Sequence, residues 1–379
     1  MSSFSEKKPD VILLLVTLCL VIVGTAMVYS SSSILAMERY NDGQYFIKKQ
    51  IIFVFLGLGI MVLLTRFPYY HLRKLAYPGV LLSVFLLGML LFSPMGVRAA
   101  GGARRWLSIF GFSFQVTEMV KVLVVMFLAH FLAKQADHLT EFKRGVMIPL
   151  LITSFIIGLI MLEPDFGTSV IVFSIFMLML YLSGSRILHI AGIAAVFAPV
   201  GLWLLVQKDY RMDRLKGFWD PWKDPLHSGF HIIQSLLSFG SGGAFGVGVG
   251  DGMQKLFYLP EPHTDFILAV IAEEMGFIGV AVVIFLFTVF IFRGFLISFN
   301  APDLFGTLLA AGLTMIIALE AIINIAGVMG LIPVKGLALP FISYGGTSLI
   351  MSLSAVGILL SISSQVGTGT QRRKGTKKF

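Results

Sequence analysis

The sequence predicts an all-α, polytopic membrane protein with about ten transmembrane helices and one long extracytoplasmic loop. Of its 379 residues, 57% are apolar and only 13% are charged, whereas about a quarter of the residues in a soluble domain are charged. Ten apolar stretches each approach the roughly 20 residues that a helix needs to cross the bilayer. These figures exclude a soluble enzyme, a disordered chain and a collagen-like repeat. The single cysteine excludes a disulfide framework and a cysteine-based metal site.

The predicted spans follow one another with short connections, except for one long loop. The first is not expected to be a cleaved signal peptide, because its apolar run of about nineteen residues is too long and no A-x-A site follows it. The ten spans are Val11–Tyr29, Ile47–Thr65, Tyr77–Ser93, Val116–Ala133, Val146–Leu162, Gly167–Leu182, Leu188–Val206, Thr264–Phe292, Leu304–Met329 and Leu339–Ser363.

Basic residues predict that both termini are cytoplasmic. With the N-terminus inside, fifteen Lys and Arg residues fall on cytoplasmic segments and seven on short external loops, as the positive-inside rule requires. We expect one transmembrane domain over residues 1–366 and a basic, disordered cytoplasmic tail over residues 367–379. The net charge of +9 indicates loops near anionic lipid headgroups, and we expect no nucleic-acid partner.

The long external loop, residues 207–263, begins with a charged stretch and continues into a glycine-rich one. Apolar residues between the glycines favour a segment that lies on the membrane surface or dips into it. The chain has no P-loop, no H-E-x-x-H and no G-x-S-x-G sequence. Any reaction must therefore use a substrate that is already activated and is delivered in or at the membrane.

A polar cluster opens the eighth predicted span. It comprises His263, Asp265 and, further along, Glu273 and Glu274. Asp265 is expected in the first helical turn, where free amides and the helix dipole favour an ionised carboxylate. Two interpretations stay open on this evidence: a general base at the membrane boundary, and a residue that only stabilises the helix N-terminus.

A second cluster, Gly102-Ala-Arg-Arg-Trp106, lies on the predicted loop between the third and fourth spans. Arginine side chains match phosphate oxygens well, but a tryptophan and arginines at this depth also suit an aromatic belt and lipid headgroups. Lys335 adds an external cation before the last span.

Polar residues also occur within or beside the spans. Glu118 and Lys121 are spaced to pair on one helix face, and such a pair is more often structural than catalytic. Asp165, in Glu163-Pro-Asp165, is suited to cap a helix or approach a cation. Glu320 and Asn324 are expected to bond to a neighbouring helix, whereas Ser343 and Tyr344 are suited to line a cavity.

Taken in order, these motifs resemble the SEDS family of shape, elongation, division and sporulation proteins, and they look more like its division branch than its elongation branch. The resemblance covers the chain from the first span to about Gln365. It rests on Gly102-Ala-Arg-Arg-Trp106, Gln115-x-x-Glu118-x-x-Lys121, Glu163-Pro-Asp-Phe-Gly-Thr168, Asp220-Pro-Trp-x-Asp224, Gln234-Ser-Leu, Tyr258-Leu-Pro-Glu-Pro-His-Thr-Asp-Phe-Ile267, Ala272-Glu-Glu-x-Gly276 and Gly330-Leu-Ile-Pro-x-Lys-Gly-Leu-x-Leu-Pro-Phe-Ile-Ser-Tyr-Gly-Gly346.

The resemblance implies an inverting peptidoglycan glycosyltransferase that polymerises lipid II, with Asp265 as the general base and undecaprenyl pyrophosphate as the leaving group. It implies Arg105 and Lys335 as partners of the pyrophosphate. We further expect Trp106, His263, Lys255, Ser343 and Tyr344 among the substrate-binding residues. Expected supporting residues are Glu118, Lys121, Asp165, Gln234 and Glu274.

The resemblance also implies partners and a location. These are lipid II, the growing glycan strand, a class B penicillin-binding protein and other division proteins, at the septum in the bacterial cytoplasmic membrane. No cofactor is required, although a divalent cation (Mg²⁺ or Mn²⁺) is compatible with a pyrophosphate site, and the metal stays unassigned. Two alternatives stay open: a lipid II flippase, and a non-catalytic scaffold for the penicillin-binding protein.

Overall fold

The computed structural model describes residues 8–92, 97–100, 103–109, 112–255 and 262–365. Within these residues, nine helices are long and apolar enough to cross a membrane, and α6 is a shorter apolar helix of 17 residues. The all-α membrane class is thus confirmed, and the predicted tail at 367–379 lies outside the described residues. The α-helices are α1 Val11–Tyr40, α2 Tyr45–Arg66, α3 Ala76–Phe92, α4 Val116–Lys134, α5 Met147–Leu162, α6 Phe166–Leu182, α7 Ile187–Val206, α8 Asp209–Trp219, α9 Phe230–Gly242, α10 Ile267–Phe299, α11 Leu304–Val328 and α12 Gly346–Ser364.

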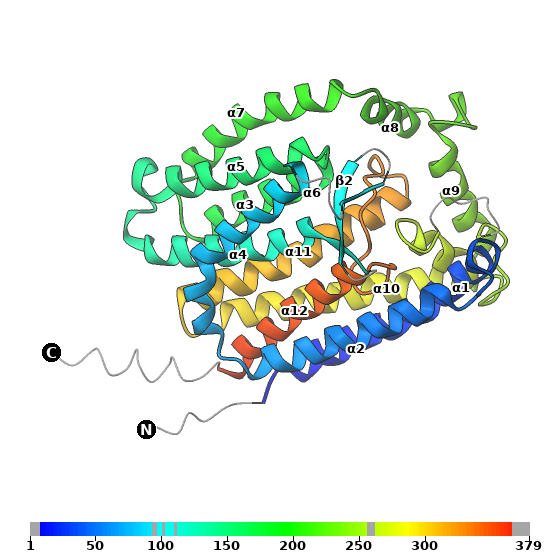
Figure 1. Ribbon diagram of the computed structural model, residues 1–379, viewed down its shortest axis with the longest axis horizontal. Coiled ribbons are helices and arrows are strands. Elements are labelled where there is room, and N and C mark those ends of the chain that lie inside the picture. The colour runs from blue at the N-terminus through cyan, green and yellow to red at the C-terminus, as the bar shows by residue number, and fades with distance from the viewer. Residues whose placement is uncertain (1–7, 93–96, 101–102, 110–111, 256–261, 366–379) are drawn as a thin grey trace.

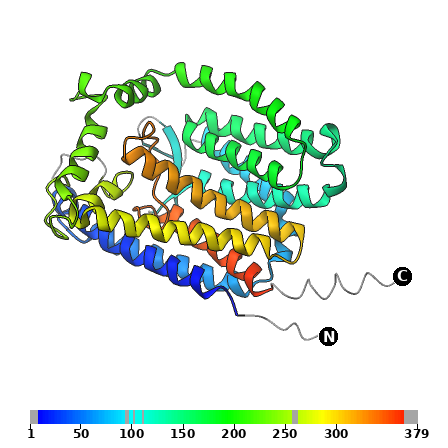
Figure 2. The same ribbon diagram turned by 180° about the vertical axis from the view of Figure 1, so that it is seen from behind.

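The helices form a bundle in which α4, α11 and α12 are the most buried. Helix α12 packs against α2, α11 packs against both α10 and α4, and α3 packs against α4 (Figures 1 and 2). Helix α7 lies along one edge of the bundle and is the most exposed of the spans.

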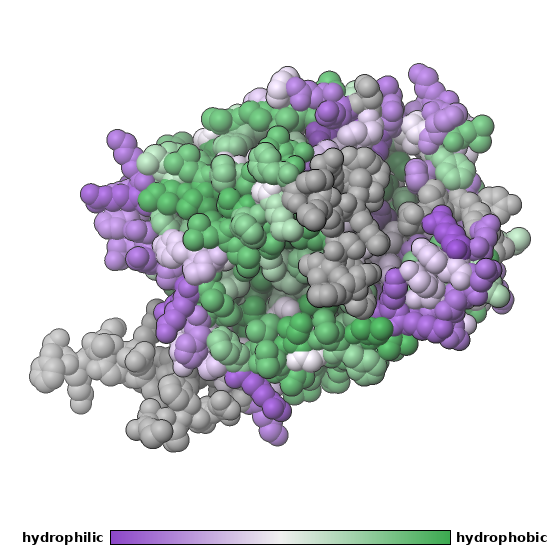
Figure 3. All heavy atoms as spheres, viewed as in Figure 1, coloured by the Kyte–Doolittle hydropathy of each residue, from purple (hydrophilic) through white to green (hydrophobic). Residues whose placement is uncertain are grey.

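Hydrophilic residues gather at the two ends of the bundle, and a hydrophobic band lies between them (Figure 3). Large apolar side chains in this band point outward, among them Phe55, Leu81 and Phe285, which are all more than half exposed. Lipid tails would cover such a surface, whereas water would not.

The start of α1 and the end of α12 meet at one end of the bundle. Asp10 caps α1 by accepting a hydrogen bond from the amide of Leu13, and its carboxylate pairs with Arg293 near the end of α10. The amide of Asp10 also donates to the Ser363 hydroxyl at the end of α12 (3.0 Å). The start of α1 and the end of α12 therefore lie at the same end of the bundle; the cytoplasmic location of the two termini stays a prediction.

The long loop contains helices α8 and α9 and a glycine-rich segment that enters a break in α10. Gly276 interrupts α10 with φ +65°, and a β-carbon there would lie 2.3 Å from the amide nitrogen of Gly246. Amides on both sides of the break find partners across it: Val247 donates to Glu273 O and Phe277 donates to Gly243 O. This segment thus packs against α10 at the break, and glycine is needed where the two backbones meet.

The connection between α3 and α4 is a small antiparallel sheet that the sequence interpretation missed. Its strands are β1 Val97–Ala100, β2 Ala103–Ile109 and β3 Phe112–Gln115, in the order β1-β2-β3. The amide of Gln115 donates to the Thr347 hydroxyl at the start of α12, and Leu107 is buried in the main core. Such short strands depend on this support from the helices.

Candidate active site

The candidate base, Asp265, lies in a turn just before α10, whereas Asp10 pairs with Arg293 near the other end of that helix. Its predicted place in the first helical turn is wrong, because α10 begins at Ile267. The carbonyls of His263, Thr264 and Asp265 accept hydrogen bonds from Tyr344 N, Ser343 Oγ and Asn324 Nδ2 respectively. Because these carbonyls accept other hydrogen bonds, they do not accept the amides of the first helical turn. The first carbonyl that accepts a hydrogen bond within α10 is that of Phe266.

The same donors hold the loop before α12 against the Asp265 turn. Asn324 also donates to the carbonyl of Leu337 (2.6 Å), so one amide bridges the two segments. Gly336, with φ +65°, lies between them: a β-carbon there would be 3.2 Å from Oδ2 of Asp265 and 4.0 Å from Nη2 of Arg214. Close approach of this loop to the Asp265 carboxylate therefore requires a glycine.

A second polar segment lies at the start of α6 and holds Arg105. The Arg105 side chain donates to the carbonyls of Pro164 (2.7 Å) and Glu163 (3.4 Å), and its Nε is 3.9 Å from Oδ2 of Asp165. Asp165 caps α6 through its bond to Thr168, as the sequence allowed. These contacts fix a guanidinium that is still 30% exposed.

Side chains of α8 join this segment to Asp265. The Tyr210 hydroxyl donates to the Pro164 carbonyl (3.3 Å) and accepts from Arg211 (2.9 Å). Arg214, one turn further along, reaches the Val334 carbonyl beside Lys335 (3.5 Å). The structure thus brings Arg105 and Lys335 to the same region as Asp265, and it adds Tyr210, Arg211 and Arg214, which the sequence interpretation had counted only as loop residues.

Burial changes the pKa values of two side chains beside the turn. Burial, together with the Arg39 charge, lowers the pKa of His263 to about 4, so this imidazole is neutral at pH 7. Burial lowers the pKa of Lys335. The His263 ring also packs at a tilt against the rings of Phe46 and Tyr344, with centroids 4.6 and 5.6 Å away.

Other predicted site residues are engaged elsewhere. Lys255 is buried and pairs with Glu274 (2.7 Å), which also bonds to Ser30. Gln234 lies on α9, partly buried. Further expected residues occupy these positions: Glu118 and Lys121 pair at 2.8 Å inside the bundle, Lys121 also contacts Glu320, and Trp106 pairs with Gln115 in the sheet.

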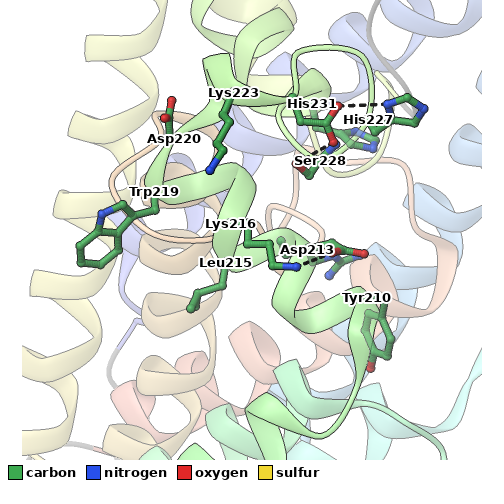
Figure 4. Close-up of a pocket in the computed structure, with 12 residues that line it drawn as sticks. Tyr210, Asp213, Leu215, Lys216, Trp219, Asp220, Lys223, His227, Ser228 and His231 are labelled. Carbon is green, nitrogen blue, oxygen red and sulfur yellow. Dashed lines mark hydrogen bonds and ion pairs between the residues drawn. The ribbon is translucent and has the colours of Figure 1, made fainter.

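A cavity lies between α8 and the start of α9 (Figure 4). Its volume is about 1050 Å³, and the 12 residues that line it all lie between Tyr210 and His231. Arg214 belongs to its wall, and His231, on the far wall, stacks on Phe266 next to Asp265 (ring centroids 5.8 Å apart).

The described residues do not form a cage for a metal ion. Within the described ranges, no three His, Cys, Asp or Glu side chains converge. Both carboxylate oxygens of Asp165 already accept bonds from Thr168. A Mg²⁺ ion needs only one or two carboxylates when it also binds substrate phosphates.

Fold and site together define a polytopic helical membrane protein with a clamped carboxylate and several cations at one end. The family of cell cycle proteins that groups FtsW, RodA and SpoVE matches residues 10–367. The chain belongs to this family, as the SEDS resemblance indicated.

Individual relatives match almost the whole chain. A protein of Geobacter sp. (strain M18) named "Probable peptidoglycan glycosyltransferase FtsW" is 42% identical over 357 residues, covering 94% of this chain and 97% of that protein. Stage V sporulation protein E of Bacillus subtilis (strain 168) is 40% identical over 358 residues, covering 94% and 98%. A solved structure described as the structural coordination of polymerization and crosslinking by a peptidoglycan synthase complex is 27% identical, with a TM-score of 0.76, covering 95% and 98%.

Proposed function

We propose that this chain is a peptidoglycan glycosyltransferase that polymerises lipid II, with Asp265 as the general base. The observation that carries the proposal is the clamped turn: three successive carbonyls around Asp265 accept hydrogen bonds from Tyr344, Ser343 and Asn324. A backbone held in this way keeps the carboxylate in a fixed place, and fixed placement of a base is a large part of its effect. The names of the relatives support the same reaction class.

In the proposed reaction, the 4-hydroxyl of the acceptor sugar attacks the anomeric carbon at the end of the growing strand. The hydroxyl proton passes to the carboxylate of Asp265 as the new C–O bond forms. The bond between the anomeric carbon and the pyrophosphate oxygen breaks, undecaprenyl pyrophosphate leaves, and the configuration inverts. No nucleotide is consumed, because the substrate arrives activated.

Cations near Asp265 supply the charge that such a leaving group needs. Arg105 is oriented by the carbonyls of Pro164 and Glu163, and Lys335 follows the carbonyl that Arg214 contacts. Preorganised cations stabilise charge that develops in the transition state. In this proposal a divalent cation, Mg²⁺ or Mn²⁺, accompanies the pyrophosphate, and no step depends on it.

The proposed setting is the bacterial cytoplasmic membrane at the division septum, with both termini in the cytoplasm. The proposed partner is a class B penicillin-binding protein, which crosslinks the strands. The solved peptidoglycan synthase complex supports a partner of this kind, since its description joins polymerization to crosslinking.

The test uses the purified full-length chain, its class B penicillin-binding protein and labelled lipid II. We expect glycan chains from the wild type and at least a thousandfold loss with Asp265→Asn, the order of loss when a catalytic group is removed. Asp42→Asn is the matched control, because Asp42 is an exposed carboxylate in the loop between α1 and α2. This control should keep full activity.

Other results of this assay would indicate a different function or a different base. Transfer of lipid II across vesicles without chain formation would indicate a flippase. Neither transfer nor chains in the presence of the partner would indicate a scaffold. Chains from a folded Asp265→Asn variant would refute Asp265 as the base.

A further inference from the structure

Helix α10 consists of two halves whose backbones bond to another segment at the break. In an unbroken helix, the carbonyl of Glu273 would accept the amide four residues later, that of Phe277. Instead, it accepts the amide of Val247 (3.0 Å), and Phe277 donates to the carbonyl of Gly243 (2.9 Å). The next two positions repeat the pattern, with bonds from Gly248 N to Glu274 O and from Ile278 N to Ala244 O. Residues 243–255, the inserted segment, thus take the place of the helix's own bonds.

The first half of α10, residues 267–275, begins two residues after Asp265. Its N-terminal end follows the turn that Asn324, Ser343 and Tyr344 clamp. Because the hydrogen-bond ladder is interrupted at Gly276, the second half of the helix does not by itself fix the direction of the first. The C-terminal end of the first half therefore depends on other contacts for its direction.

The side chain of Glu274 supplies one of these contacts. It pairs with Nζ of Lys255 (2.7 Å) and accepts a hydrogen bond from the Ser30 hydroxyl of α1 (2.7 Å). Lys255 also donates to the carbonyl of Gly250 (2.6 Å) and to the Ser30 hydroxyl (3.2 Å). One buried ion pair thus joins α1, the inserted segment and the first half of α10.

The side chain of Glu273 holds the same segment at a second point. Its Oε1 accepts the amides of Met253 (2.7 Å) and Gln254 (3.1 Å). A β-carbon on Gly252 would lie 2.8 Å from its Oε2, so the carboxylate and the backbone of the segment are in close contact. Neighbouring positions on a helix point about 100° apart, and the two acids therefore engage the inserted segment from two directions.

Burial makes the ion pair sensitive to position. The side chains of Lys255 and Glu274 are 4% and 0% exposed. The cost of removing two charges from water offsets much of their attraction, so such a pair adds little net stability. Separating the two charges in a medium of low dielectric constant is costly. A shift of the first half of α10 against the inserted segment would separate them, so the pair favours a single arrangement.

We propose that Lys255 and Glu274 are positioning residues for the base: they lock the inserted segment to the first half of α10 and so set the direction in which that half carries Asp265. The proposal rests on the proposed glycosyltransferase function and adds to it a second support for Asp265, at the other end of the half-helix from the clamp. In this proposal Lys255 acts through Glu274 and does not contact substrate.

The kinetic test uses the purified full-length chain with its class B penicillin-binding protein and labelled lipid II. Lys255→Met leaves a buried carboxylate without its cation, so the unfolding midpoint should fall. The double variant Lys255→Met/Glu274→Gln removes both charges and should regain most of the midpoint. Its kcat should nevertheless stay about tenfold to a hundredfold below that of the wild type, because a misplacement of about 1 Å has effects of this size. Its KM for lipid II should stay near the wild-type value, since the substrate contacts are kept.

Asp10→Asn/Arg293→Met is the matched control. This ion pair also engages α10, but on the second half, beyond the break at Gly276. An asparagine still caps α1, and kcat should stay at the wild-type value whatever the change in the midpoint. Recovery of both the midpoint and kcat in the Lys255→Met/Glu274→Gln variant would show that the pair serves stability alone, and an equal loss of kcat in the control would show that any ion pair on α10 suffices. Either result would overturn the proposal.

A second measurement does not depend on turnover. Amide hydrogen exchange in the Lys255→Met/Glu274→Gln variant should be at least about tenfold faster than in the wild type over residues 267–275, and unchanged over residues 277–299, because only the first half loses a restraint. Unchanged exchange over residues 267–275, in a chain that polymerises lipid II, would overturn the lock and leave the proposed function standing. The expected exchange pattern in a chain that never polymerises lipid II would support the lock and refute the polymerase.

Discussion

Glu163 is the residue beside the site whose replacement has the most clearly defined consequence. It follows α5, is 1% exposed, and among the described residues neither of its carboxyl oxygens has a hydrogen-bond partner. Burial, and to a lesser extent the neighbouring Asp165 charge, raise its pKa to about 8, against the opposing effect of Arg105. We predict that Glu163→Gln stabilises the protein in a pH-dependent way.

The sign and size follow from the two pKa values. Below pH 4.5 the carboxyl is protonated in both the folded and the unfolded chain, so it contributes no pH dependence. Between pH 4.5 and about 8 only the unfolded chain ionises, and the folded state loses stability as the pH rises. At about 1.4 kcal/mol per pH unit the full interval is worth about 5 kcal/mol as an upper bound. Glutamine does not titrate, so the stability of the variant does not fall with pH for this reason.

The assay compares unfolding midpoints of the wild type and Glu163→Gln from pH 5 to pH 8.5. The midpoint of the variant should exceed that of the wild type by an amount that grows with pH and reaches about 3–6 °C. About 0.8 kcal/mol changes the midpoint of a chain of this length by one degree. Glu38→Gln is the control, because Glu38 is exposed, and the difference between its midpoint and that of the wild type should not change with pH. A gap between Glu163→Gln and wild type that does not change with pH would refute the reasoning.

Two further substitutions test the interior of the bundle and the clamp on the active-site turn. Lys121→Met removes the cation between the carboxylates of Glu118 and Glu320. We expect the free energy of unfolding to fall by about 3–5 kcal/mol, measured by thermal unfolding. Adding Glu320→Gln should recover part of this loss, and an unchanged unfolding midpoint would contradict the prediction. Asn324→Leu removes both amide bonds to the active-site loops, so polymerisation should fall about tenfold to a hundredfold through misplacement of the base. Asn300→Leu, on an exposed amide at the opposite end of the bundle, is its control; equal rates in the two asparagine variants would show that the clamp does not position the base.

Two basic residues, Arg105 and Lys335, lie on the predicted external side of the membrane. Lysines and arginines on the external side work against the positive-inside rule, which is why Arg105 and Lys335 needed another explanation. The structure supplies it for Arg105, whose guanidinium is held by two carbonyls next to Asp165. These contacts give the Arg105 guanidinium a structural role at the start of α6.

The sequence by itself determined the parts of this protein that depend on composition and local spacing. Ten apolar stretches were recognisable because the bilayer sets the length of a spanning helix. The pair Glu118 and Lys121 was recognisable because a spacing of three residues places two side chains on one helix face. The division-type motifs were sufficient to indicate the family.

Tertiary structure alone decided what lies next to Asp265. Residues from α8, α11 and the loop before α12 converge there, and they lie 51 (Arg214) to 79 (Tyr344) positions from Asp265 in the chain, beyond any local period. The start of α10 was misplaced for the same reason: Asn324, Ser343 and Tyr344 engage the carbonyls that would have begun the helix. Local sequence can show that a carboxylate precedes a helix, but only packing between distant segments fixes that carboxylate in place.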